Sequence, residues 1–130
     1  MFNCDLVVDC EGAAPTLRCH LPVSERRRAM WVNSAQVHVD RVKDLDRDMV
    51  VVYLGSTYAP GFFAWVIPWR DGSAKVGVAA RERNPRVLLE RFMAKHPDTS
   101  KRLRGIGWRD ASFHPIPLGG PISKTYYHGM

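Results

Sequence analysis

Several signatures of common protein classes are missing from this sequence. No apolar run approaches the roughly 20 residues that a membrane-spanning helix requires, and the N-terminus lacks the charged-then-apolar pattern of a signal peptide. A cytoplasmic location is therefore expected. The chain also has no internal repeat or low-complexity tract. Its 130 residues, 45% of them hydrophobic, predict a single domain over residues 1–130 that is large enough to bury a core of its own.

Cysteine is scarce as well. The chain has three, Cys4, Cys10 and Cys19, all within the first twenty residues. An odd number placed so close together predicts reduced thiols rather than a disulfide framework. No CxxC or HxxxH spacing accompanies them, so the sequence predicts no metal site.

Catalytic signatures are also absent. The sequence contains no GxGxxG or Walker phosphate loop, and no nucleophile stands in a recognisable arrangement with a base. Its five histidines are scattered along the chain, and each is expected to be structural or exposed. The sequence therefore indicates no catalytic residue, and any redox chemistry would have to be carried by a cofactor.

Positive charge is in excess. The formal net charge is +6, and basic residues gather at positions 26–28 and 101–104. These clusters could meet nucleic acid phosphates, anionic lipid headgroups or an acidic partner, or could form a solvated face. Nucleic acid is the disfavoured partner, because the basic clusters are not interleaved with aromatic residues.

The most informative stretch that is present covers residues 58–81. Two apolar runs flank Asp71 and Gly72, which predicts a β-hairpin with a two-residue type I′ turn. That loop sets a register in which residues on one aromatic, apolar face pair across the strands. The predicted pairs are Trp69 with Ala74, Ile67 with Val76, Trp65 with Val78 and Phe63 with Ala80. The opposite face would then carry Phe62, Ala64 and Val66 against the small residues Gly77 and Ala79.

Further elements are predicted from residue periodicity. Strands are expected within residues 4–10, 34–42 and 105–113, and a central strand over 49–54. An amphipathic helix should begin at Pro85 with Asn84 as its cap and end at His96. One helical turn is expected near 24–30, and the proline-rich residues 114–121 should form a loop. Short connections make the sheet largely antiparallel, so the fold class is α+β with one main helix.

Two interpretations of the aromatic face remain open from the residues alone. It could be a core sheet covered by the helix at 85–96, since aromatic stripes mostly pack inside proteins. It could instead be an apolar pocket for a hydrocarbon ligand, with Phe63, Trp65 and Ile67 on one wall.

The hairpin also resembles a known family. The segment PGFFAWVIP over residues 60–68 is similar to the PxxYxWxFP signature of the geranylgeranyl reductase family, with Phe63 in place of Tyr and Ile67 in place of Phe. The segment DLVVDCEG over residues 5–12, followed by Arg18, resembles a second family stretch, with Asp9 in place of Gly and Glu11 in place of Asp. Residues 116–121 look like the segment that leads back toward the flavin domain.

This resemblance implies a fold like the substrate domain of p-hydroxybenzoate hydroxylase-type flavoproteins. It further implies that the complete enzyme uses FAD to reduce isoprenoid double bonds. Phe63, Trp65, Ile67 and Pro68 would line the lipid site, and Glu11 and Gly12 would approach the cofactor. The family's GxGxxG and GDAAG motifs have no counterpart here, so the chain resembles only the substrate-binding middle region.

The chain alone is therefore expected neither to hold FAD nor to be active. Its expected partners are an isoprenoid or lipid substrate and either the membrane surface or a partner chain supplying the flavin domain. The alternative function is a non-enzymatic module that binds an apolar ligand or another protein.

Overall fold

The fold is built around a five-stranded sheet with two helices. The computed structural model describes residues 4–13, 16–21, 30–81, 83–103, 107–120 and 126. The strands lie in the order β2-β3-β4-β1-β5, and β1 with β4, β2 with β3 and β3 with β4 pair antiparallel. The α+β prediction with a mostly antiparallel sheet is confirmed. The elements are η1 (Arg18–His20), β1 (Trp31–Val39), β2 (Val51–Leu54), β3 (Phe63–Pro68), β4 (Ala74–Ala80), α1 (Pro85–Lys95), α2 (Thr99–Arg102) and β5 (Trp108–Pro117).

The hairpin between β3 and β4 turns through three residues rather than two. The N–H of Gly72 donates to the carbonyl of Trp69 at 3.0 Å, and the N–H of Trp69 donates to the carbonyl of Ser73 at 2.8 Å. Gly72 has a φ of +87°, a conformation that glycine adopts without a steric penalty. Together these features form a type I turn closed by a left-handed glycine, so the predicted type I′ turn is wrong.

The extra loop residue shifts the register by one. Trp65 pairs with Gly77 and Ile67 with Lys75, so the predicted pairings of these residues with Val78 and Val76 are wrong. Because side chains alternate between the two sides of a strand, a one-residue shift moves every partner to the other face. The small residues of β4 therefore lie on the same face as the aromatic rings, whereas the predicted register put them on the opposite face.

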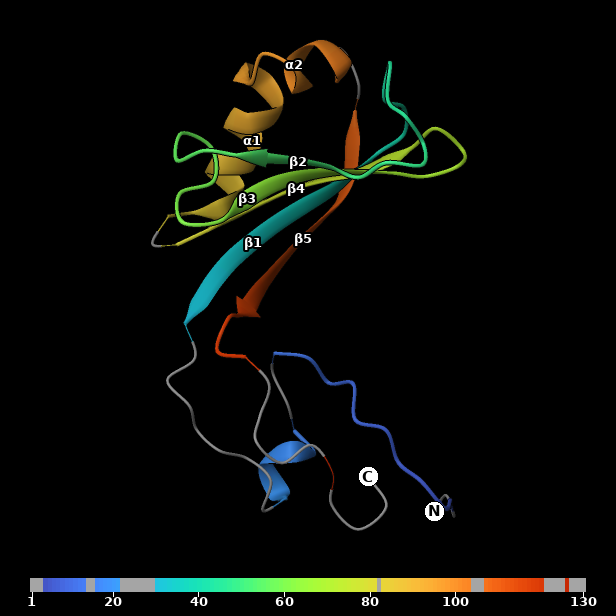
Figure 1. Cartoon of the computed structure of the whole chain (residues 1–130), viewed down its shortest axis with the longest axis vertical. Coiled ribbons are helices and arrows are strands. Elements are labelled where there is room, and N and C mark those ends of the chain that lie inside the picture. The colour runs from blue at the N-terminus through green and yellow to red at the C-terminus, as the bar shows by residue number, and fades with distance from the viewer. Residues whose placement is uncertain are drawn as a thin grey trace. The chain divides into compact units, whose positions relative to one another are not determined.

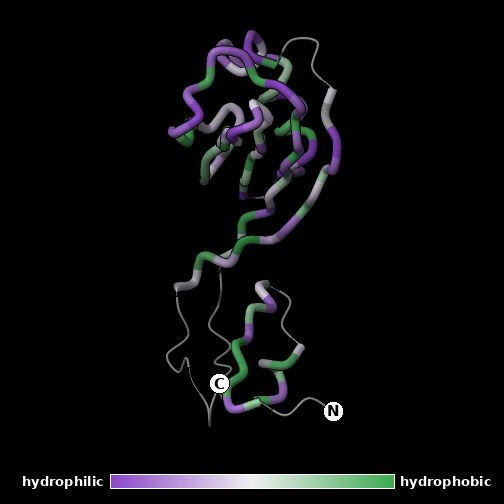
Figure 2. The backbone as a smooth tube through the Cα atoms, turned by 90° about the vertical axis from the view of Figure 1, so that its right-hand side faces the viewer, coloured by the Kyte–Doolittle hydropathy of each residue, from purple (hydrophilic) through white to green (hydrophobic). Residues whose placement is uncertain are grey.

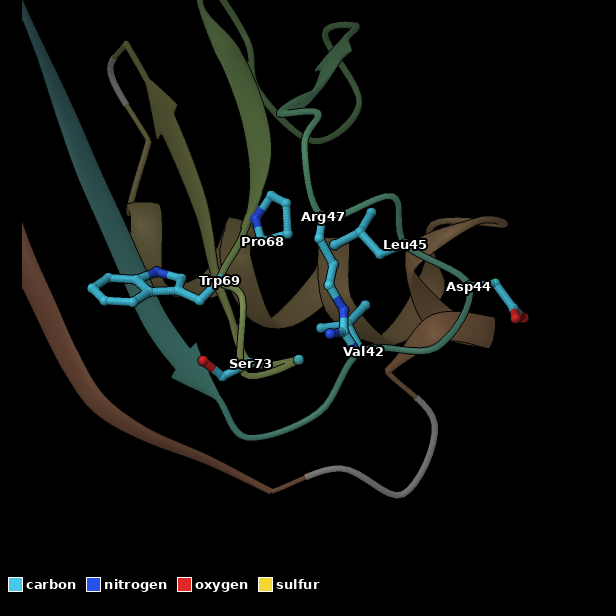
Figure 3. Close-up of a pocket in the computed structure, with 8 residues that line it drawn as sticks. Val42, Asp44, Leu45, Arg47, Pro68, Trp69 and Ser73 are labelled. Carbon is cyan, nitrogen blue, oxygen red and sulfur yellow. The ribbon is translucent and has the colours of Figure 1, made fainter.

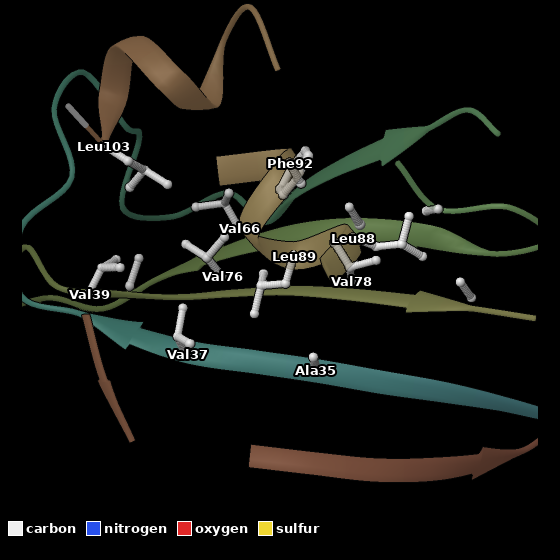
Figure 4. Packing of buried hydrophobic residues seen from close by; sticks show 14 residues of the cluster. Ala35, Val37, Val39, Val66, Val76, Val78, Leu88, Leu89, Phe92 and Leu103 are labelled. Carbon is white, nitrogen blue, oxygen red and sulfur yellow. The ribbon is translucent and has the colours of Figure 1, made fainter. Parts of the chain in front are cut away.

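One side of the sheet, here called the helix face, carries Ala64, Val66, Val76 and Val78 and is covered by α1. From the helix, the side chains of Leu88, Leu89 and Phe92 pack onto it, as Figure 4 shows, and Phe92 is fully buried. Each such side chain contributes about 1.5–3 kcal/mol by leaving water. The core of Val32–Ile116 is thus the layer between α1 and the helix face.

The helix that forms this layer begins and ends as its residues predict. The side chain of Asn84 accepts a hydrogen bond from the N–H of Arg86 at 3.0 Å, and Pro85 takes the first helical position. These are the signals of a helix N-terminus. The second helix, α2, was not expected in the polar stretch after Pro97. Figure 1 shows both helices on the same side of the sheet.

Three other expectations fail. Residues 4–10 form no strand; an apolar run so short needs a neighbouring strand for its backbone hydrogen bonds. The strand β2 is an edge of the sheet rather than central. The loop expected over residues 114–121 is wrong for 114–117, which belong to β5. Its prolines at 115 and 117 are tolerated because β5 is the opposite edge of the sheet, where strands accept proline. The helical turn expected near 24–30 falls largely outside the described residues.

By contacts, the chain divides into two compact units: Val32–Ile116 is one, and Met1–Trp31 with Pro117–Met130 is the other. In the second unit, the N–H of Leu118 donates to the carbonyl of Met30 at 2.7 Å. Along the tube in Figure 2, green hydrophobic stretches are short and interrupted by purple hydrophilic ones. Among the described residues, no helix is long and apolar enough to cross a membrane.

Candidate functional site

The side of the sheet opposite α1, here called the aromatic face, brings three predicted substrate residues together. Phe63, Trp65 and Ile67 alternate with the buried residues of β3 and are half-buried. The register of β2 places Val52 beside Trp65 and Leu54 beside Phe63. Paired residues share a face of the sheet. These five apolar side chains of β2 and β3 therefore form one patch.

Trp65 lies directly over Gly77. A Cβ atom at Gly77 would stand 2.3 Å from the indole Cε2 and Cζ2 atoms and 2.7 Å from Nε1. Such distances leave no room for any side chain, so glycine is required here by the close approach of the ring. Gly77 and Ala79 are buried although neither belongs to the helix face. The rings of β3 thus form the outer layer of this side of the sheet.

Neighbouring aromatic rings hold Trp65 in place. The rings of Phe63 and Trp65 meet edge to face with centroids 6.0 Å apart, and Phe62 stacks on Phe63 at 4.1 Å. Both arrangements are favourable for aromatic pairs. They give the patch a fixed shape before any ligand arrives.

The patch continues onto the edge of the sheet, where it is exposed. Val52 is 50% exposed and Leu54 is 83% exposed. Single exposed apolar residues are ordinary, but a contiguous group that continues a row of aromatic rings indicates a contact surface. Of the two interpretations of the aromatic face, the core covered by the helix at 85–96 is wrong, because that helix packs on the other side.

Pro68, the fourth predicted substrate residue, is placed differently. Its position in β3 alternates with Ile67 and so belongs to the side of Ala64 and Val66. It borders an open cavity of about 220 Å³ at the end of the hairpin, drawn in Figure 3. The cavity is lined by Val42, Asp44, Leu45, Arg47, Pro68, Trp69, Gly72 and Ser73.

The two predicted cofactor residues lie in the other unit, within a tight local loop. The carboxylate of Glu11 accepts hydrogen bonds from the N–H of Thr16 at 2.9 Å, from the N–H of Leu17 at 2.8 Å, and from the hydroxyl of Thr16. Gly12 has a φ of +70°, which suits glycine in a turn. Glu11 therefore fixes the backbone just before η1 by hydrogen bonds. The sequence did not predict this structural role.

A half-buried polar network at the end of α1 was not predicted from the sequence. The hydroxyl of Tyr53 donates to Asp98 at 2.5 Å, and Nε of Arg102 donates to the other carboxylate oxygen at 2.7 Å. Burial, together with the hydrogen bond to Asp98, raises the pKa of Tyr53 well above its ordinary range. The one signal in the sequence was the four-residue spacing of Asp98 and Arg102, which aligns them on a helix. The network joins α2 to β2.

No group of three or more histidine, cysteine or acidic side chains suited to a metal ion occurs among the described residues. His96 is enclosed by the rings of Tyr53, Tyr58 and Phe92, with centroids 4.8, 5.1 and 5.2 Å away. His96 therefore packs against aromatic residues on the helix side of the sheet.

Comparisons with known proteins find the same family by its family model and by individual relatives. Residues 32–109 match the family model described as the geranylgeranyl reductase catalytic domain. The chain is 33% identical over 134 residues to digeranylgeranylglycerophospholipid reductase 2 of Methanothermobacter thermautotrophicus and 25% identical over 128 residues to the corresponding reductase of Methanocaldococcus jannaschii. These matches cover 98% and 96% of this chain but 32% of each relative, so the chain spans about a third of their length.

Solved structures share the fold. A geranylgeranyl bacteriochlorophyll reductase-like protein from Thermoplasma acidophilum matches with a TM-score of 0.66 and 22% identity, over 85% of this chain and 28% of that one. A flavoprotein/dehydrogenase from Cytophaga hutchinsonii matches with a TM-score of 0.62 and 16% identity, over 82% and 28%. The expected likeness to the substrate region of flavoproteins of this kind is confirmed at the level of the fold.

Proposed function

The chain belongs to the geranylgeranyl reductase family, and we propose that its aromatic face is the wall against which an isoprenoid chain lies during reduction of its double bonds. The observation that carries this proposal is the apolar patch of Val52, Leu54, Phe63, Trp65 and Ile67, which no helix covers in the described part of Val32–Ile116. A contiguous exposed apolar surface of this kind suits contact with a hydrocarbon ligand.

Reduction requires a hydride donor, and in the complete flavoenzyme reduced FAD would supply the hydride. The described residues do not fit the pyrophosphate of that cofactor. Glu11 keeps the acidic charge that the family has at this place, but its carboxylate oxygens are already engaged by Thr16 and Leu17. Asp9 adds a second carboxylate where the family has Gly. A like charge at this place would repel a pyrophosphate. We therefore propose that residues outside this chain, on the same or on a partner polypeptide, hold FAD.

Within this proposal, the residues of the chain bind and orient the substrate. Trp65 and Phe63 offer their rings to the hydrocarbon, and Gly77 lets the indole lie close against β4. Val52 and Leu54 extend the wall to the edge of the sheet. Excluding water from the isoprenoid protects a hydride transfer from competing reactions.

Equilibrium dialysis of radiolabelled geranylgeraniol against the 130-residue chain tests the wall. Serine at both Val52 and Leu54 should weaken binding at least tenfold, because burying each apolar side chain contributes about 1.5–3 kcal/mol. Val87→Ser is the matched control, since Val87 is 57% exposed on α1, away from the aromatic face. The proposal fails if the wild-type chain shows no saturable binding, or if the control loses as much affinity as the double variant.

Purification of the same chain tests the placement of FAD. The expected preparation shows no flavin absorbance at 1:1 stoichiometry, including after incubation with FAD and desalting. A stoichiometric yellow product would contradict the assignment of FAD to residues outside this chain and leave the hydrocarbon wall to be judged by dialysis.

A further inference from the structure

One end of the aromatic face carries basic and polar groups. Lys75 on β4 pairs with Ile67 of β3 on one side and with His38 of β1 on the other. Paired residues share a face, so the ammonium and imidazole groups stand on the aromatic face in the row that ends the apolar patch. We call the group of His38, Trp69 and Lys75 the basic corner.

Trp69 holds the corner together. The Nζ atom of Lys75 lies 5.7 Å from the centroid of the Trp69 ring, within the range of a cation–π contact. The ring of His38 meets the same indole edge to face, with centroids 6.3 Å apart. Trp69 is 48% exposed, so solvent or a ligand reaches this corner. A half-exposed tryptophan under an ammonium group limits the positions that the lysine side chain can take.

Within the described part of the chain, no ion pair neutralises the positive charge of Lys75. The ion pairs among the described residues join Arg86 with Glu90, Arg102 with Asp98 and Arg109 with Asp40. Asp71, in the hairpin loop, is the acid whose charge interacts with His38. One carboxylate oxygen of Asp71 accepts the N–H of Ser73 at 2.9 Å and its hydroxyl at 2.6 Å. Asp71 is thus held to its own turn, and Lys75 keeps a charge for an outside partner.

We propose that the basic corner binds the phosphate headgroup of an isoprenoid lipid whose chain runs along β3 over Ile67, Trp65 and Phe63. This rests on the proposed function and adds the polarity and orientation of the substrate. From Ile67 to Phe63 the strand spans about 13 Å, at about 3.3 Å per residue, so the apolar rows accept a long hydrocarbon. An ammonium group and a phosphate form a charge-assisted hydrogen bond, which is stronger than a hydrogen bond between neutral groups.

Two ligands that differ only in the headgroup test the proposal. Geranylgeranyl phosphate and geranylgeraniol, each below its micelle-forming concentration, are dialysed against the 130-residue chain at low ionic strength. The wild-type chain should prefer the phosphate at least about tenfold, and added salt should reduce this preference. Lys75→Gln should lower the preference to within about twofold and leave the affinity for the alcohol unchanged.

Matched variants separate the role of this lysine from a general loss of charge. Lys95→Gln removes an exposed lysine of α1 and should keep the full preference. Lys75→Arg retains a cation at the corner and should keep most of it. His38→Gln changes the other polar side chain of the row without touching the charge of Lys75, and a partial loss is expected. This second position keeps the test informative if Lys75→Gln fails to fold.

The outcomes distinguish the two proposals. If geranylgeraniol binds as tightly as the phosphate, or if Lys75→Gln and His38→Gln both keep the preference of the wild type, the headgroup site is overturned and the hydrocarbon wall stands. If neither ligand binds, the proposed function falls together with the inference. If inorganic phosphate competes at the concentration at which geranylgeranyl phosphate binds, the corner is a site for free anions, which overturns its assignment to a lipid.

Discussion

Both faces of the same sheet carry apolar residues but use them differently. On the helix face, Val66, Val76 and Val78 are buried beneath α1. On the aromatic face, Trp65 and Phe63 are half-buried, and Leu54 is 83% exposed. Replacing a side chain that packs into the core lowers the stability of the fold. Replacing an exposed side chain changes the stability little. The comparison therefore separates residues that hold the fold from residues that are available to a ligand.

The largest effect is expected from the helix face. Phe92→Ala should lower the free energy of unfolding by about 3–5 kcal/mol, because Phe92 is fully buried and meets the rings of Tyr53 and Tyr58. Urea denaturation followed by circular dichroism measures the change. Val87→Ala on the exposed side of the same helix should stay within about 0.5 kcal/mol. Equal losses in the two variants would mean that α1 does not cover this face.

An intermediate effect is expected beneath the aromatic rings. Gly77→Ala should cost about 1–3 kcal/mol by overpacking and should push the Trp65 indole outward, because the new Cβ would lie 2.3 Å from the ring. Tryptophan fluorescence should shift to longer wavelength. Adding Trp65→Ala to the variant should restore part of the lost stability.

Gly107→Ala is the matched control for this change, since a Cβ at Gly107 would meet nothing within 4 Å. It should leave both stability and fluorescence near their wild-type values. A neutral Gly77→Ala would place the indole somewhere other than over Gly77 and would contradict the close packing of Trp65 against β4.

A pH-dependent effect should come from the network at the end of α1. Burial raises the pKa of Asp98, but the hydrogen bonds from Tyr53 and Arg102 outweigh it and hold that pKa below the ordinary carboxyl range. Asp98 therefore stabilises the fold above the ordinary Asp pKa of about 4, and this contribution disappears as the pH falls through the lowered value.

Unfolding by urea at a series of pH values between about 2 and 6 measures this contribution. Asp98→Asn should flatten the loss of stability on acidification, and Asp48→Asn, at an exposed carboxylate of the loop before β2, should retain it. An unchanged pH profile in the Asp98 variant would show that the network does not form in solution.

The smallest effect on stability is expected at the edge of the aromatic face. Leu54→Ser should change the free energy of unfolding by no more than about 0.5 kcal/mol, because the leucine is 83% exposed. Thermal unfolding checks this. A loss above about 1.5 kcal/mol, on the scale of a buried side chain, would mean that Leu54 is covered in the folded chain and is not available to a ligand.

Much of the fold could be predicted from local sequence. The helix that starts at Pro85 after its Asn84 cap, the strand within 34–42 and the hairpin at 58–81 all appear in the structure. Each of these depends on periodicity or capping over a few neighbouring residues. The edge positions of β2 and β5 could not be predicted in this way, because they depend on pairings between residues that lie far apart in the chain.

The candidate site shows the same division. The sequence by itself determined that Phe63, Trp65 and Ile67 share one face of a strand and that the chain resembles geranylgeranyl reductases. Only the tertiary structure decided which face the helix covers and which residues of β4 lie beneath the rings. The covered face depends on where Leu88, Leu89 and Phe92 of α1 pack. The partners on β4 depend on the single extra residue in the hairpin loop, closed by Gly72 in a left-handed conformation. It moves every cross-strand partner to the other face, placing Gly77 under Trp65 and Lys75 beside Ile67.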